Sequence, residues 1–93
     1  MNETVEREFA INRELGLHAR PAGQFVSLAS RFESEITVGR GDEWVDGRSV
    51  LSLLSLAAGS GSALRIRATG PDAAEAVEAL GRLLEAEEHD SVR

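Results

Sequence analysis

Cysteine, lysine and tyrosine are absent from this chain of 93 residues, and aromatic residues make up only 4% of it. Without cysteine the chain has neither a disulfide framework nor a thiolate metal site. It has only two histidines, so a metal site would have to rest on carboxylates, and we expect no metal and no cofactor. Its ten basic residues are all arginine and are outnumbered by acids, and the net charge of −6 argues against nucleic acid as the main partner.

Long apolar runs are also missing. No stretch is long enough to cross a membrane, and no basic segment followed by an apolar stretch marks a secretory signal, so the expected compartment is the cytoplasm. The length indicates one small domain spanning residues 1–93. We expect an ordered core over about residues 4–86 and a polar tail over residues 87–93.

The spacing of apolar residues predicts an alternation of strands and helices. Period-two patterns predict strands over Thr4–Asn12, Ser34–Arg40, Glu43–Asp46 and Ala63–Thr69. Helical spacing predicts helices over Ala19 to about Arg31, over Ser49–Leu56, and along the stripe of Ala73, Val77, Leu80 and Leu84. The order β-α-β-β-α-β-α, with one hairpin, predicts an α+β open-faced sandwich: a four-stranded, mostly antiparallel sheet with three helices packed on one face.

Several residues match the chemistry of helix starts. Pro21 suits a first turn, where a missing N–H costs nothing, and Ser49 is placed to cap the short helix. Asp72, with Glu75 three residues later, resembles a capping box for the last helix.

His18 stands immediately before the first predicted helix. A neutral imidazole is a nucleophile at physiological pH, and a helix start offers free N–H groups and a positive dipole end to an anion. Arg20 adds a fixed cation nearby, and no Asp or Glu occurs between Leu15 and Phe32. This segment has the local chemistry of a histidine that carries a phosphoryl group.

The segment Gly16-Leu17-His18-Ala19-Arg20-Pro21-Ala22 resembles the phosphorylation-site signature of HPr, the histidine-containing phosphocarrier family of the bacterial phosphotransferase system. The chain is also similar to the family in Gln24-Phe25-Val26, Ser34-Glu35-Ile36-Thr37-Val38 and Arg48-Ser49-Val50-Leu51. The resemblance extends from about Thr4 to Glu85.

The resemblance implies a carrier and not an independent catalyst. His18 would accept a phosphoryl group on Nδ1 from phosphorylated enzyme I, which draws it from phosphoenolpyruvate, and would pass it to EIIA-type proteins in sugar uptake or regulation. Arg20 and Ala19 would hold the phosphate. A carrier that docks alternately with two partners is most simply a monomer.

The resemblance also implies a partner surface and a regulatory site. The residues expected to contact partners are Arg20, Gln24, Arg48, Val50, Leu51 and Leu54. Ser49 matches the serine that a dedicated HPr kinase phosphorylates in many bacteria, and Arg48 beside it could pair with a phosphate. The cap remains the simpler role for Ser49.

Two alternatives stay open. One is a carrier of a regulatory branch, like the nitrogen-related paralogue, with the same histidine chemistry but a different enzyme I. The other is a non-catalytic adaptor that binds a regulator through the helix that Ser49 begins. The presence of both His18 and Arg20 favours a carrier over an adaptor, because binding alone needs no nucleophile.

Overall fold

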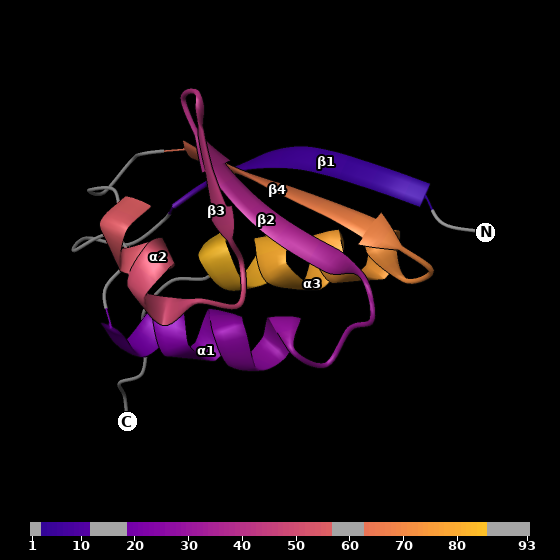
Figure 1. The fold of residues 1–93 in the computed structure, drawn as a ribbon, viewed down its shortest axis with the longest axis horizontal. Coiled ribbons are helices and arrows are strands. Elements are labelled where there is room, and N and C mark those ends of the chain that lie inside the picture. The colour runs from indigo at the N-terminus through magenta and orange to yellow at the C-terminus, as the bar shows by residue number, and fades with distance from the viewer. Residues whose placement is uncertain (1–2, 12–18, 57–62, 86–93) are drawn as a thin grey trace.

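A computed structural model describes residues 3–11, 19–56 and 63–85 of the chain. The strands are β1 (Glu3–Ala10), β2 (Glu35–Arg40), β3 (Glu43–Asp46) and β4 (Ala63–Gly70), and the helices are α1 (Ala19–Ala29), α2 (Val50–Leu56) and α3 (Ala73–Glu85). The strands form one sheet in the order β1-β4-β2-β3, and every pairing is antiparallel. The helices lie on one side of this sheet (Figure 1), so the predicted order and architecture are confirmed.

The core lies between the sheet and the helices. Alternate residues of β4 and β2 point into it, and each is at most 2% exposed: Leu64, Ile66, Ala68, Ile36 and Val38. The helices contribute buried residues at helical spacing, with Phe25 on α1 and Leu80 on α3 among the largest. Full burial of such a side chain contributes about 1.5–3 kcal/mol. The apolar residues at period two in the strands and at helical spacing in the helices therefore face each other and form one core.

The predicted bounds of β1 differ from the structure at both ends. β1 was expected over Thr4–Asn12 but covers Glu3–Ala10, and Asn12 lies outside the described residues. Within β1, Arg7 interrupts the apolar face. Its exposed side chain places the guanidinium carbon 5.0 Å from the ring centroid of Phe9, a cation–π contact that keeps a charge on this face.

The end of α1 also differs from the prediction. The helix was expected to reach about Arg31 but ends at Ala29. The N–H of Arg31 donates to Leu28 O and that of Phe32 to Ala29 O, so the chain tightens into i to i+3 turns. Apolar spacing that continued to Phe32 therefore extended the prediction beyond the helix itself.

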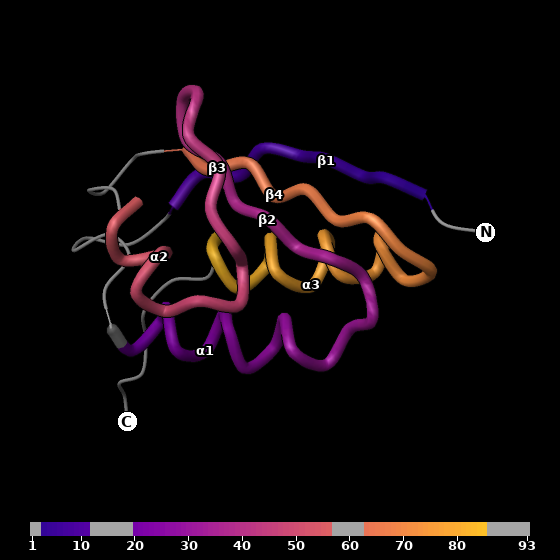
Figure 2. Tube along the Cα trace, in the orientation of Figure 1, coloured from indigo at the N-terminus to yellow at the C-terminus, as the bar shows by residue number. Residues whose placement is uncertain are grey.

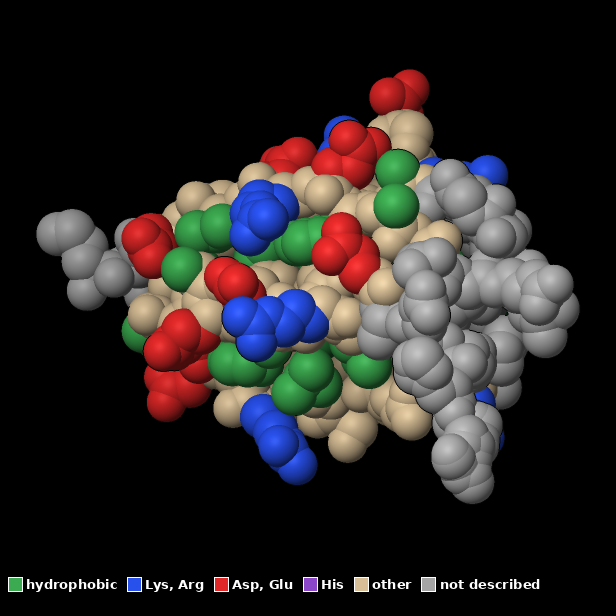
Figure 3. Space-filling model, turned by 180° about the vertical axis from the view of Figure 1, so that it is seen from behind, with side chains coloured by type: hydrophobic (Ala, Val, Ile, Leu, Met, Phe, Trp, Pro, Cys, Tyr) green, Lys and Arg blue, Asp and Glu red, His purple; other side chains and the backbone are tan. Residues whose placement is uncertain are grey.

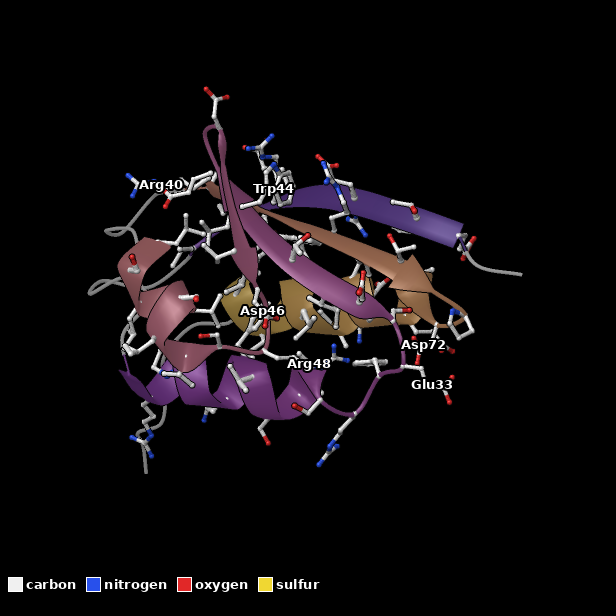
Figure 4. The ribbon with its side chains drawn as sticks, in the orientation of Figure 1. Glu33, Arg40, Trp44, Asp46, Arg48 and Asp72 are labelled. Carbon is white, nitrogen blue, oxygen red and sulfur yellow. The ribbon has the colours of Figure 1, made fainter. Side chains whose placement is uncertain are left out.

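Asp72 joins two segments that are distant in the sequence. Its carboxylate accepts hydrogen bonds from Glu33 N (2.9 Å), Ser34 N (3.0 Å) and Ser34 Oγ (2.6 Å) in the connection between α1 and β2 (Figure 4). Its backbone carbonyl accepts the N–H of Ala76 at the start of α3. The Ser34 hydroxyl is the largest cause that lowers the pKa of the Asp72 carboxyl below its ordinary value, followed by the N–H of Glu33.

The outer face of the sheet carries Trp44 on β3. Its ring lies against Gly39, where an added Cβ would come within 2.7 Å of the ring carbons. The guanidinium carbons of Arg67 and Arg65 lie 4.0 and 4.8 Å from the ring centroid, and Arg67 Nε is 3.1 Å from Glu6 Oε1. A half-buried aromatic ring and paired charges thus cover this part of the outer face.

The surroundings of two helical glycines, Gly81 on α3 and Gly23 on α1, predict opposite effects of a substitution by alanine. A Cβ at Gly81 would lie 2.2 Å from the Phe9 ring, whereas one at Gly23 would meet nothing within 4 Å. We expect Gly81→Ala to lower the free energy of unfolding by about 1–3 kcal/mol through overpacking. Gly23→Ala should raise it by about 0.5–1 kcal/mol through helix propensity. Urea denaturation of both variants checks this, and a stabilising Gly81→Ala would contradict the close contact.

The Asp72 hydrogen bonds predict a dependence of stability on pH. A carboxyl whose pKa is lowered by folding stabilises the native state above its unfolded pKa, and that contribution is lost as the pH falls through the folded pKa. Asp72→Ala should therefore unfold at a lower temperature than the wild type at neutral pH, and the gap should narrow in acid as the charge-dependent part is lost. Asp42→Ala, in the exposed hairpin turn, is the control. A gap that stays constant in acid would show that the charge of Asp72 is irrelevant.

Candidate functional site

The first turn of α1 holds the described part of the predicted site. α1 begins at Ala19, directly after His18, and His18 itself lies outside the described residues. Pro21 and Ala22 are buried while Arg20 is exposed. Pro21 therefore occupies the first turn, as predicted, and the helix begins where the signature requires.

The solvent side of α1 is polar and free of acids. Arg20, Gln24 and Ser27 are exposed at helical spacing, and the first turn contains no acidic residue. A helix start favours an anion by about 0.3–1 kcal/mol, and a nearby carboxylate would oppose this effect. Arg20 and the dipole of α1 thus act in the same direction at this end of the helix.

The short helix α2 contacts α1, and Figure 2 shows α2 above the beginning of α1, at one end of the molecule. Leu53 and Leu56 are buried, but Leu51 is 73% exposed and Val50 and Leu54 are half-buried. A two-turn helix cannot direct all its apolar residues into the core. The structure thus leaves apolar surface on α2, as the sequence predicts. That partners use Val50, Leu51 and Leu54 stays a prediction.

Ser49 caps α2. Its hydroxyl accepts the N–H of Ser52 at 3.1 Å, and its carbonyl accepts the N–H of Leu53 at 3.0 Å. The predicted cap is confirmed by this geometry. A regulatory role for Ser49 stays a prediction.

Arg48 has a position that its sequence context does not indicate. Its side chain is half-buried, and Nη2 lies 3.2 Å from Ala29 O, 2.7 Å from Phe32 O and 3.0 Å from Ser34 O. These carbonyls belong to the last residue of α1 and to the connection after it, so Arg48 has a role within the fold. Its expected contact with a phosphate or a partner stays a prediction.

Two features are absent from the part of the chain that the structure describes. Within residues 3–11, 19–56 and 63–85, no three His, Asp or Glu side chains are grouped as a metal site requires. In the same part of the chain, no helix has the length and apolarity to cross a membrane. Seen from behind, the acidic and basic side chains are interspersed (Figure 3).

Comparison with known proteins identifies the family to which this sequence and this fold belong. Residues 5–86 match the family model described as the PTS HPr component phosphorylation site. The phosphocarrier protein HPr of Pseudomonas putida is 42% identical over 79 residues, which cover 84% of this chain and 88% of that protein. The chain belongs to the HPr family. The structure of HPr from Bacillus anthracis has a TM-score of 0.83 and 37% identity, covering 87% of this chain and 96% of that one.

The chain is also similar to a relative with a different name, NPr. The phosphocarrier protein NPr of Shewanella violacea is 40% identical over 82 residues, covering 88% of this chain and 90% of that protein. The chain is thus a member of the HPr/NPr phosphocarrier family of the phosphotransferase system. Similar identities to both named relatives do not favour one branch over the other.

The cap predicts how two substitutions of Ser49 differ. Ser49→Ala removes the acceptor for the Ser52 N–H and should cost about 1 kcal/mol in the free energy of unfolding. Ser49→Asp keeps an acceptor and adds negative charge at the helix start, so it should be close to the wild type in stability. Urea denaturation measures both. Equal losses in the two variants would contradict a cap through the side-chain oxygen.

Proposed function

We propose that this HPr-family protein carries a phosphoryl group on Nδ1 of His18, from phosphorylated enzyme I to EIIA-type proteins in the cytoplasm. The observation that carries the proposal is the family match over residues 5–86, which is described as a phosphorylation site and includes His18. The start of α1 at the next residue, and the exposure of Arg20 in its first turn, support the same assignment.

The chemistry is a displacement at phosphorus that occurs twice, once with each partner. The lone pair of Nδ1 attacks phosphorus, a bond from Nδ1 to phosphorus forms, and the bond to the donor group on enzyme I breaks with its electron pair returning to the donor. The phosphoryl group then leaves for a histidine of the acceptor by the same displacement, so water is neither consumed nor released. Such transfers depend on positioning and electrostatics more than on covalent catalysis by the surroundings.

Arg20 stabilises the phosphoryl group without hydrolysing it. Its guanidinium stays protonated, so it donates charge-assisted hydrogen bonds but does not act as a general acid on the bond between nitrogen and phosphorus. The free N–H groups at the start of α1, beginning at Ala19, supply further donors. The acid-free first turn places no competing carboxylate there.

The partners dock on the surface that α1 and α2 share. Gln24 on α1 and Leu51 on α2 are both exposed, and Val50 and Leu54 extend the apolar part. A small apolar patch ringed by polar residues is typical of a docking surface. A monomer can present this surface to enzyme I and to an acceptor in turn.

Transfer of the phosphoryl group from phosphoenolpyruvate tests the proposal. With a catalytic amount of enzyme I from the same organism, the intact mass should rise by one phosphoryl group, and the added mass should be lost in acid. His18→Ala should show no added mass, whereas Ser49→Ala should be phosphorylated like the wild type. Arg20→Ala should be phosphorylated roughly 100-fold more slowly, the lower end of the scale expected when a donor to the transferred group is lost.

The controls separate this function from its alternatives. If the His18→Ala variant still gains an acid-labile phosphoryl group, the assignment of His18 is wrong. If the wild type gains none while enzyme I phosphorylates another carrier, the chain functions as a binding adaptor. Enzyme I proteins of the sugar and nitrogen branches, compared side by side, identify the branch.

A further inference from the structure

Arg48 connects segments that carry the two halves of the docking surface. It lies in the link between β3 and α2, one residue before the cap Ser49. Its side chain points toward the end of α1 (Figure 4). There its Nη2 atom is within 3.2 Å of three carbonyl oxygens, those of Ala29, Phe32 and Ser34. Arg48 therefore spans from the start of α2 to the end of α1.

The end of α1 has room for such a donor, because Ala29 O accepts the N–H of Phe32 through one lone pair and a carbonyl oxygen has two. The last carbonyls of a helix have no N–H partners within it and form the negative end of its dipole. The last turn of α1 contains no basic residue, so the helix does not neutralise its own end. Arg48 supplies a charged donor from another segment, and charge-assisted hydrogen bonds are roughly twice as strong as neutral ones.

The link that carries Arg48 is itself held in place. Gly47 N donates to Ile36 O at 2.9 Å, and Arg48 N donates to Asp46 Oδ1, also at 2.9 Å. Ser49 N donates to Asp46 O at 3.3 Å, and Ser49 then caps α2. A short run of hydrogen-bonded backbone thus joins Arg48, which binds the end of α1, to the first turn of α2.

We propose that Arg48 is a positioning residue, which sets α2 against α1 and so aligns Leu51 with Arg20 and Gln24 for partner docking. This inference rests on the proposed carrier function. It differs from a direct contact with a phosphate or a partner, because Arg48 acts through the carbonyls that it binds. Loss of the guanidinium shifts α2 and weakens docking, while the chemistry at the start of α1 is unchanged.

The kinetics of phosphorylation by enzyme I test this role. Well below the unfolding temperature, Arg48→Ala should raise the KM for the carrier roughly tenfold with kcat unchanged. This is the pattern expected when the lost interaction had stabilised the bound ground state and the transition state equally. Arg48→Lys, with three ammonium donors, should restore most of the affinity. Arg82→Ala removes the same charge from an exposed site on α3, paired with Glu78, and should leave the KM unchanged.

Three kinetic results would overturn the proposal. These are an unchanged KM in Arg48→Ala, a fall in kcat alone, or an equal rise of KM in Arg82→Ala, which would make net charge the cause. If Arg48→Ala does not fold, Arg48→Met, which keeps an unbranched side chain but has no donor for the three carbonyls, takes its place, and a KM equal to that of the wild type contradicts the proposal.

A second readout keeps the inference distinct from the proposed function. Residual dipolar couplings measured by NMR report the orientation of α2 relative to α1 without any phosphoryl transfer. They should change in Arg48→Ala and stay the same in Arg82→Ala. If the wild type accepts no phosphoryl group, the carrier function fails but this test of Arg48 still stands. Unchanged couplings in Arg48→Ala overturn the positioning role.

Discussion

The connection from α1 to β2 is held by ionic groups from two other segments. Arg48, from the link between β3 and α2, donates to carbonyls of residues 29, 32 and 34. Asp72, at the start of α3, accepts from the N–H groups of residues 33 and 34 and from the hydroxyl of Ser34, which is 0% exposed. Because Ser34 is buried, its N–H, hydroxyl and carbonyl are shielded from water and need partners within the protein. The cation and the anion complete the pairing and fix where α1 ends.

This constraint bears on the proposed function because it fixes α1 at the end opposite to the proposed site. A helix held at its C-terminal end has a defined direction over the core, so its first turn presents the exposed Arg20 in a defined direction. The charge distribution suits that surface: the chain has a net charge of −6, yet residues 15–32 and 47–71 contain no Asp or Glu. Both α1 and α2 lie within these acid-free stretches, and the acids lie on other elements.

Local sequence patterns predicted most of the fold. Strict alternation identified β4, the turn residues identified the hairpin, and helical spacing with a cap identified α2 and Ser49. The bonds of Arg48 and Asp72 had no such signal, because their partners are 14 to 39 residues away and the pairing depends on how the elements pack. Asp72 matched a local capping pattern, yet its carboxylate reaches the connection before β2. The proposal of phosphoryl transfer rests on a short signature and a family resemblance, and the periodicity of apolar residues contains no information about it.

The most direct test is a comparison of two-dimensional ¹H–¹⁵N NMR spectra before and after phosphorylation by enzyme I and phosphoenolpyruvate. A phosphoryl group on His18 should shift the amide signals of the first turn of α1, including Ala19, Arg20 and Ala22, with smaller changes on α2. The amides near Trp44, on the outer face of the sheet, should stay unchanged. Changes centred on the start of α2 at Ser49, with the signals of α1 unaltered, would contradict a carrier that works at the start of α1.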